Sequence, residues 1–144
     1  MNLMRSVVLA VGLLGVAVSA FGHHSEGAYD RTPVTLSGTV TKYLYANPHT
    51  LIYFDTLGEN GVMQNWVIVT AAPAVLSRRG WKRDMLAPGD TITVTAFVSK
   101  EKKHEMRLQP GLSTHQLVVN SGKSKGMTVK VRGEVTCPQN PLHG

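Results

Sequence analysis

The sequence predicts an all-β domain with one short helix. Polar and apolar residues alternate along several short segments, and Gly, Pro or Asn residues separate these segments. The predicted order is three strands, a helix and two further strands. That order is typical of the small Greek-key β-barrel of oligonucleotide/oligosaccharide-binding (OB) proteins, so we expect an OB-like barrel. An open β-sandwich is the alternative arrangement of the same strands.

Residues 1–22 predict a signal peptide. Arg5 follows the N-terminal amine, residues 6–18 form an uncharged and mostly apolar run, and small residues come next. This run is shorter than the roughly 20 apolar residues of a membrane-spanning helix. We therefore expect a periplasmic or secreted protein, cleaved after Ala20 or Gly22, with no membrane span after cleavage.

Either cleavage places His23 and His24 at or next to a free α-amino group. A chain that begins at Phe21 offers the amine, two amide nitrogens and the His23 imidazole as a square-planar set for Cu(II) or Ni(II). A chain that begins at His23 offers its amine and its own imidazole, and a second imidazole completes a T-shaped copper site. An α-amine has a pKa of about 7.7–8.0, so it binds metal near neutral pH. Copper is the predicted cofactor, and a solvated tail without a metal role is the alternative.

The first strand is predicted at Val34–Tyr45, after an N-terminal connector at residues 23–33. Even-numbered residues from Val34 to Val40 share the apolar face, and Gly38 at the centre predicts a bulge or a sharp bend. The other predicted strands are Thr50–Asp55, Val62–Thr70, Thr91–Ser99, Gln116–Asn120 and Met127–Arg132, and the first two of these are joined by a hairpin loop containing Asn60-Gly61.

The short helix is predicted within Ala71–Gly80, with Pro73 in its first turn, basic residues in its last turn and Gly80 after its end. Lys100–Arg107 is predicted as a charged loop or an extended hairpin tip. The barrel domain thus covers residues 34–132, and residues 133–144 form a tail. Cys137 is the only cysteine, so an internal disulfide is excluded, and we interpret this residue as incidental.

Removal of residues 1–22 leaves 14 basic and 9 acidic residues, a formal net charge of +5. This charge favours an acidic envelope component or a protein partner, and export argues against nucleic acid. The sequence shows no nucleophilic triad and no Gly-rich phosphate loop, so we do not expect an enzyme. A binding or scaffold module is the alternative to the metal-binding function. Its predicted contact residues are Tyr43, Tyr45, Trp66, Lys100, Lys102 and Lys103.

Several short motifs occur in a characteristic order: His23-His24-Ser25, Asn47-Pro48-His49, Trp66, and Arg79-Gly80-Trp81 before Leu86-x-Pro-Gly-Asp. In this order the chain resembles a family of short exported bacterial proteins of unknown function, with a His-His-Ser mature start and an Asn-Pro-His motif. The resemblance covers roughly residues 22–98 and implies a secreted β-barrel without catalytic residues. Thr70, where the family suggests an acidic residue, and the basic segment Lys100–Arg107 depart from it.

The two histidine motifs predict that His23, His24 and His49 converge on one metal ion. Ten residues of an extended strand span about 33 Å, and the connector reaches back about 30 Å. Convergence therefore requires the connector to run alongside the barrel. The alternative role for His49 is to cap the turn behind Pro48.

Overall fold

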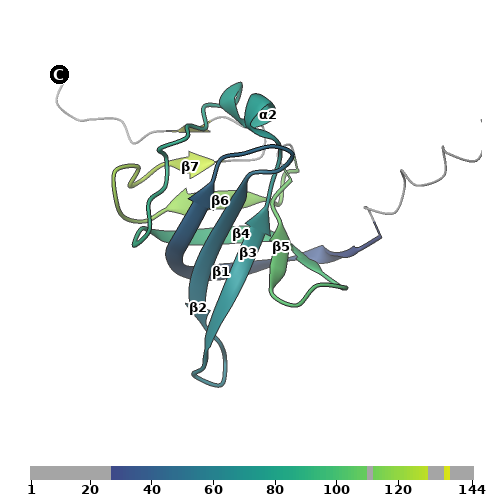
Figure 1. The fold of residues 1–144 in the computed structure, drawn as a ribbon. Coiled ribbons are helices and arrows are strands. Elements are labelled where there is room, and N and C mark those ends of the chain that lie inside the picture. Colours follow the sequence, from purple (N-terminus) through teal and green to yellow (C-terminus); the bar gives the residue numbers. More distant parts are fainter. Residues whose placement is uncertain (1–26, 110–111, 130–134, 137–144) are drawn as a thin grey trace, which may run out of the picture.

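The computed structural model describes residues 27–109, 112–129 and 135–136, which form a barrel with additional strands (Figure 1). The predicted signal peptide, His23, His24, Cys137 and His143 lie outside the described residues. The elements are β1 (Tyr29–Leu44), β2 (Leu51–Leu57), β3 (Met63–Val69), α2 (Pro73–Ser77), β4 (Thr91–Ser99), β5 (Glu105–Arg107), β6 (Gln116–Val119), β7 (Thr128–Val129) and β8 (Val135–Thr136).

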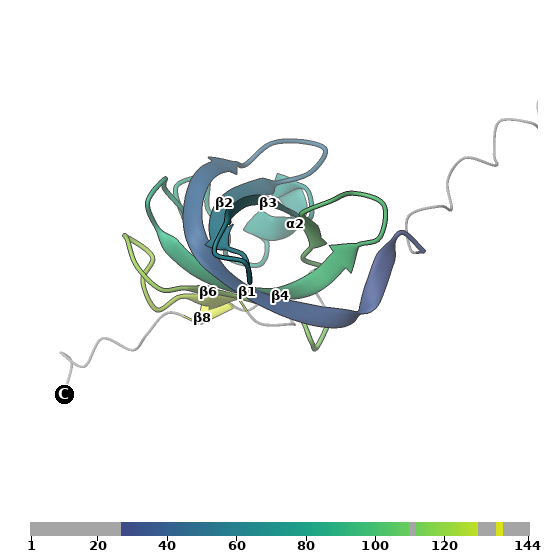
Figure 2. The same cartoon turned by 90° about the horizontal axis from the view of Figure 1, so that it is seen from below.

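Five strands close the barrel in the order β1-β2-β3-β5-β4, and β4 pairs with β1 again. The pairing of β3 with β5 is parallel, and the other pairings are antiparallel. The helix α2 connects β3 to β4. This arrangement confirms the predicted OB-like Greek-key barrel, and Figure 2 shows the closed ring from below.

The long strand β1 closes the ring because it changes partner along its length. Residues from Tyr29 to Thr39 pair with β4, and residues from Thr39 to Leu44 pair with β2. Gly38 lies at the changeover, where an added Cβ would collide with the carbonyl oxygen of Asp55 and the ring of Phe54. The register then shifts between Val40 and Lys42, so the predicted irregularity lies within a few residues of Gly38.

The fifth strand of the ring differs from the prediction. It is β5, which lies within the segment expected to be a charged loop or hairpin tip, whereas the expected fifth strand, β6, pairs with the first half of β4 outside the ring. Only three residues form β5, and Glu105 and Arg107 flank the single apolar residue Met106. A strand this short and charged does not show the alternation of a predictable strand.

The first and the last described strands differ from the predicted strands. β1 begins at Tyr29, inside the segment expected to be a connector, because Tyr29 and Pro33 pair with the end of β4. Within the segment expected to be a tail, β8 pairs with β7.

The helix α2 lies over one end of the barrel, and the β2–β3 hairpin projects from the other end (Figure 1). Pro73 occupies the first turn of α2, as the sequence predicted. Gly80 follows the end of the helix, also as predicted, and has a φ of 85°. The helix ends at Ser77, so Arg78 and Arg79 follow it and do not belong to its last turn. No helix among the described residues has the length and apolar character needed to cross a membrane.

Apolar side chains from all five barrel strands fill the interior. They include Val40, Ile52, Phe54, Ile68, Ile92, Val94 and Met106, which are essentially inaccessible to solvent. Leu76 of α2 and Trp81 after it close the core at the helix end. Full burial stabilises the fold by about 1.5–3 kcal/mol for each large apolar side chain.

We expect Gly38→Ala to lower the free energy of unfolding by about 1–3 kcal/mol, because the new Cβ meets backbone that must shift. Urea denaturation measures this change. Gly27→Ala is the matched control, since an added Cβ there meets no atom within 4 Å and should change stability by less than about 0.5 kcal/mol. Equal effects of the two substitutions would contradict a close approach at Gly38.

Candidate functional site

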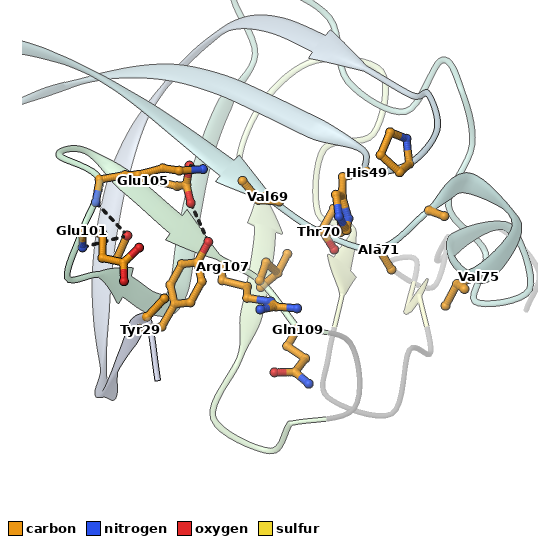
Figure 3. A pocket seen from close by; sticks show the side chains of 16 residues that line it. Tyr29, His49, Val69, Thr70, Ala71, Val75, Glu101, Glu105, Arg107 and Gln109 are labelled. Atoms are coloured by element: carbon orange, nitrogen blue, oxygen red, sulfur yellow. Dashed lines mark hydrogen bonds and ion pairs between the residues drawn. The ribbon is translucent and has the colours of Figure 1, made fainter. Parts of the chain in front are cut away.

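A cleft of about 830 Å³ lies along the outside of β3 and β5 (Figure 3). It is lined by the start of β1, the β1–β2 turn, the end of β3, the helix α2, the β4–β5 loop and β5. Figure 3 shows Tyr29 and Glu105 at one end of this β3–β5 cleft, His49 and Val75 toward the other, and Arg107 between them. The volume is within the range of small-molecule sites.

The cleft brings together two parts of the chain that an extended β1 would separate. Ala28 and Tyr29, before and at the start of β1, line the same cleft as His49, which follows its end. The reason is the change of partner along β1, since the strand curves around the barrel and does not run straight. His23 and His24 lie outside the described residues, only five and four positions before Ala28.

His49 is held by Thr70, the residue that follows β3. Its Nδ1 lies 3.1 Å from the carbonyl oxygen of Thr70, which can only accept, so Nδ1–H is the donor and the neutral imidazole carries its lone pair on Nε2. Metal-binding histidines commonly donate their second ring N–H to a carbonyl in this way. The contact connects the β1–β2 turn to the residue after β3, so the His49 Nδ1 bonds across the barrel edge and not within its own turn.

The other end of the cleft is built around a buried carboxylate. Glu105 is 7% exposed, accepts a hydrogen bond of 2.5 Å from the Tyr29 hydroxyl, and pairs with Lys102 at 3.2 Å. The Arg107 guanidinium lies over the Tyr29 ring, 5.4 Å from its centroid. Burial, followed by the hydrogen bond to Glu105, raises the pKa of Tyr29 to about 12.

The tyrosines proposed as contact residues support the helix end of the barrel. The Tyr43 hydroxyl donates to the carbonyl of Lys82, and the Tyr45 hydroxyl donates to the carbonyl of Pro73. Both rings pack against the core, and burial raises the pKa of Tyr43 above its ordinary range. These phenols therefore hold the α2–β4 segment, outside the cleft.

The structure does not gather Trp66 and the three lysines into one surface patch around the cleft. Trp66 packs against the core, with its ring 4.9 Å from that of His104. Lys100 pairs with Asp30 at 3.8 Å, and Lys102, which lines the cleft, pairs with Glu105. Lys103 is exposed on the β4–β5 loop.

Within the described residues, no group of three or more His, Cys, Asp or Glu side chains is arranged to hold a metal ion. His49 therefore belongs to no such group in this part of the chain. His115 is buried elsewhere, where its Nδ1 accepts from the amide of Gln109, and burial lowers its pKa.

Sequence reasoning missed Tyr29, Glu105 and Arg107. The sequence offered only a weak signal, because apolar Met106 lies between Glu105 and Arg107 but three residues are too few to establish the alternation of a strand. The surrounding basic residues obscured that pattern. Nothing local to Tyr29 indicates a partner 76 positions away.

A family model, described as a family of unknown function (DUF6152), matches residues 10–107. The chain belongs to this family. The match ends with β5, so it includes all five strands of the barrel ring, while β6, β7 and β8 follow it. This membership agrees with the expected uncharacterised family, and no curated protein matches the chain.

We expect Tyr29→Phe to lower the free energy of unfolding by about 1 kcal/mol at neutral pH, because a buried carboxylate loses a donor. The folded-state pKa is raised from 10.0, so this stabilisation is present below about pH 10 and is lost as the pH rises through about 12. Urea denaturation at increasing pH measures the difference between the two proteins.

Tyr53→Phe is the control, since the Tyr53 hydroxyl makes no hydrogen bond within the part of the chain that the structure describes. A Tyr29→Phe difference that stays constant between pH 9 and 12 would contradict the proposed contact with Glu105.

Proposed function

We propose that this DUF6152 protein is an exported, non-enzymatic metal-binding module, and that copper is held by its mature N-terminus together with His49. The observation that carries the proposal is that Ala28 and His49 line one cleft. Five extended residues reach roughly 17 Å, so His23 and His24 are tethered at the edge of a cleft that already contains an oriented imidazole.

The orientation of His49 supports a role as a ligand. Its Nδ1–H is occupied by the Thr70 carbonyl, and its Nε2 lone pair is the one available for a metal ion. Imidazole and an α-amine are ligands that suit Cu(II). A chain that begins at His23 supplies an amine and an imidazole, and the His49 imidazole then completes a T-shaped set.

The two predicted cleavage sites give different roles to His49. A chain that begins at Phe21 fills the square plane with its own four nitrogens, so His49 is then unnecessary. A chain that begins at His23 leaves one coordination position on the copper ion for the His49 imidazole. We favour the second product because Ala28, which follows the N-terminal segment, lines the same cleft as His49.

The test is to purify the exported protein, measure its intact mass and titrate it with Cu(II) by calorimetry. We expect a chain that begins at His23 and binds one equivalent tightly. His23→Ala with His24→Ala should weaken binding at least about 100-fold, and His49→Ala at least about tenfold, since loss of even a supporting contact costs 10- to 100-fold.

His143→Ala is the matched control, because it removes an imidazole near the C-terminus. A mature start at Phe21 with His49→Ala binding as tightly as the parent would overturn the role of His49. Weak binding shared by the parent and the doubly substituted protein would overturn the metal module.

A further inference from the structure

We propose that two copies of this chain form a dimer by pairing edge to edge along the first half of β3. The parallel pairing of β3 with β5 covers residues 67–69, and no described strand pairs with the same side of β3 at residues 63–66. In Figure 1 the β2–β3 hairpin accordingly extends beyond β5. Residues 63–66, called the open β3 edge below, are not among the described residues that line the β3–β5 cleft.

The direction of the backbone groups shows which residues of the open β3 edge can pair. The Val67 amide donates to the carbonyl oxygen of His104, 3.0 Å away, so Val67 faces the β5 side. Because N–H and C=O groups alternate between the two sides of a strand, Asn65 and Met63 face the β5 side as well, whereas Trp66 faces β2. The N–H and C=O groups of Asn65 and Met63 therefore project past the end of β5, where no described strand meets them.

The open β3 edge lacks the features that commonly block strand pairing, which are Lys, Pro and β-bulges. β3 contains neither Lys nor Pro, and its register with β2 is continuous. Residues 43–77 contain no Lys or Arg, although the whole chain has 15 of them. Apolar side chains are exposed beside the edge, since Leu57, Val62 and Met63 are 66%, 57% and 60% exposed. Adjacent exposed apolar residues of this kind mark interaction surfaces.

A second copy fits the open β3 edge because the pairing is self-complementary. In an antiparallel pair with its two-fold axis at Gln64, Met63 of each copy lies opposite Asn65 of the other. Both residues face the partner strand, so each such pair exchanges two N–H···O bonds. The same register places Val62 of each copy opposite Trp66 of the other, and a β-branched residue opposite an aromatic one is a favourable cross-strand pair.

The charges beside the open β3 edge also favour this orientation. The hairpin tip carries Glu59 and the β4–β5 loop carries Lys103, and both are exposed without an ion pair among the described residues. The β4–β5 loop ends at His104, beside Val67 on the side of β3 that contains the open edge. Antiparallel pairing directs the hairpin tip of each copy toward this loop of the other copy, so an acidic group meets a basic one twice.

The test is sedimentation velocity of the full mature chain, treated with EDTA, between about 10 μM and about 1 mM protein. We expect a monomer–dimer equilibrium within this range, because a small interface gives weak, reversible association. Met63→Lys should weaken dimerisation at least about tenfold, since it adds an edge-blocking charge. Val34→Lys is the matched control at an exposed apolar residue of β1, and it should leave dimerisation unchanged.

Charge exchange tests the orientation of the two copies. Glu59→Lys and Lys103→Glu should each weaken dimerisation about twofold to fivefold, as expected for exposed ion pairs. The chain with both substitutions keeps the net charge of the parent, and its dimerisation should return to the parent level. Glu59→Lys combined with Lys125→Glu is the matched control, because Lys125 is an exposed lysine in the turn between β6 and β7, and this pair should not restore dimerisation.

Amide hydrogen exchange of the unsubstituted protein keeps the test independent of how the variants fold. Exchange at the Asn65 amide should slow as the protein concentration rises, whereas the Trp66 amide, which faces β2, should be protected at every concentration. A chain that stays monomeric, even if it pairs this edge with another protein, would overturn the proposal. Asn65 exchange that does not change with concentration, or equal effects of Met63→Lys and Val34→Lys, would also overturn it. Because the protein is metal-free, these outcomes do not depend on copper binding.

Discussion

The change of partner along β1 is the constraint on which the rest of the structure depends. A strand of 16 residues pairs first with β4 and then with β2, and the ring closes only because its backbone curves tightly against Asp55 at Gly38. The same curvature carries Tyr29 onto Glu105 and places the beginning of the domain at the cleft that contains His49. Barrel closure and the candidate site therefore have one geometric cause.

Much of the barrel follows from local patterns in the sequence. Neighbouring residues determine the alternation in β1 to β4, the Asn60-Gly61 turn and the helix α2 between Pro73 and Gly80. A hydrophobic period and a turn residue therefore suffice to predict these elements. β5 is different, because three residues rich in charge form a strand only when β3 and β4 already flank them. The stability of β5 comes from pairing with strands that are distant in the sequence, so the local sequence does not predict it.

The candidate site was also only partly predictable from the sequence. His49 was predicted from its motif, and the structure adds the contact with Thr70 that directs its ring. Tyr29, Glu105 and Arg107 were not predicted, since they become neighbours only through the closure of the barrel. Conversely, Tyr43 and Tyr45 looked available as contact residues, but their hydroxyls hold the segment that closes the helix end. The residue types indicated which chemical groups these side chains carry, and the topology of the barrel determined which contacts those groups make.

Paramagnetic broadening of amide resonances by one equivalent of Cu(II), measured by NMR on the mature protein, tests the central claim most directly. The proposed site lies where the start of β1 and the β1–β2 turn share one cleft. We expect the signals of Ala28, His49 and Thr70 to broaden first, while those of Asn60 in the projecting hairpin remain sharp. Loss of signal near Asn60 with Thr70 unaffected, or no localised loss at any residue, would contradict the account.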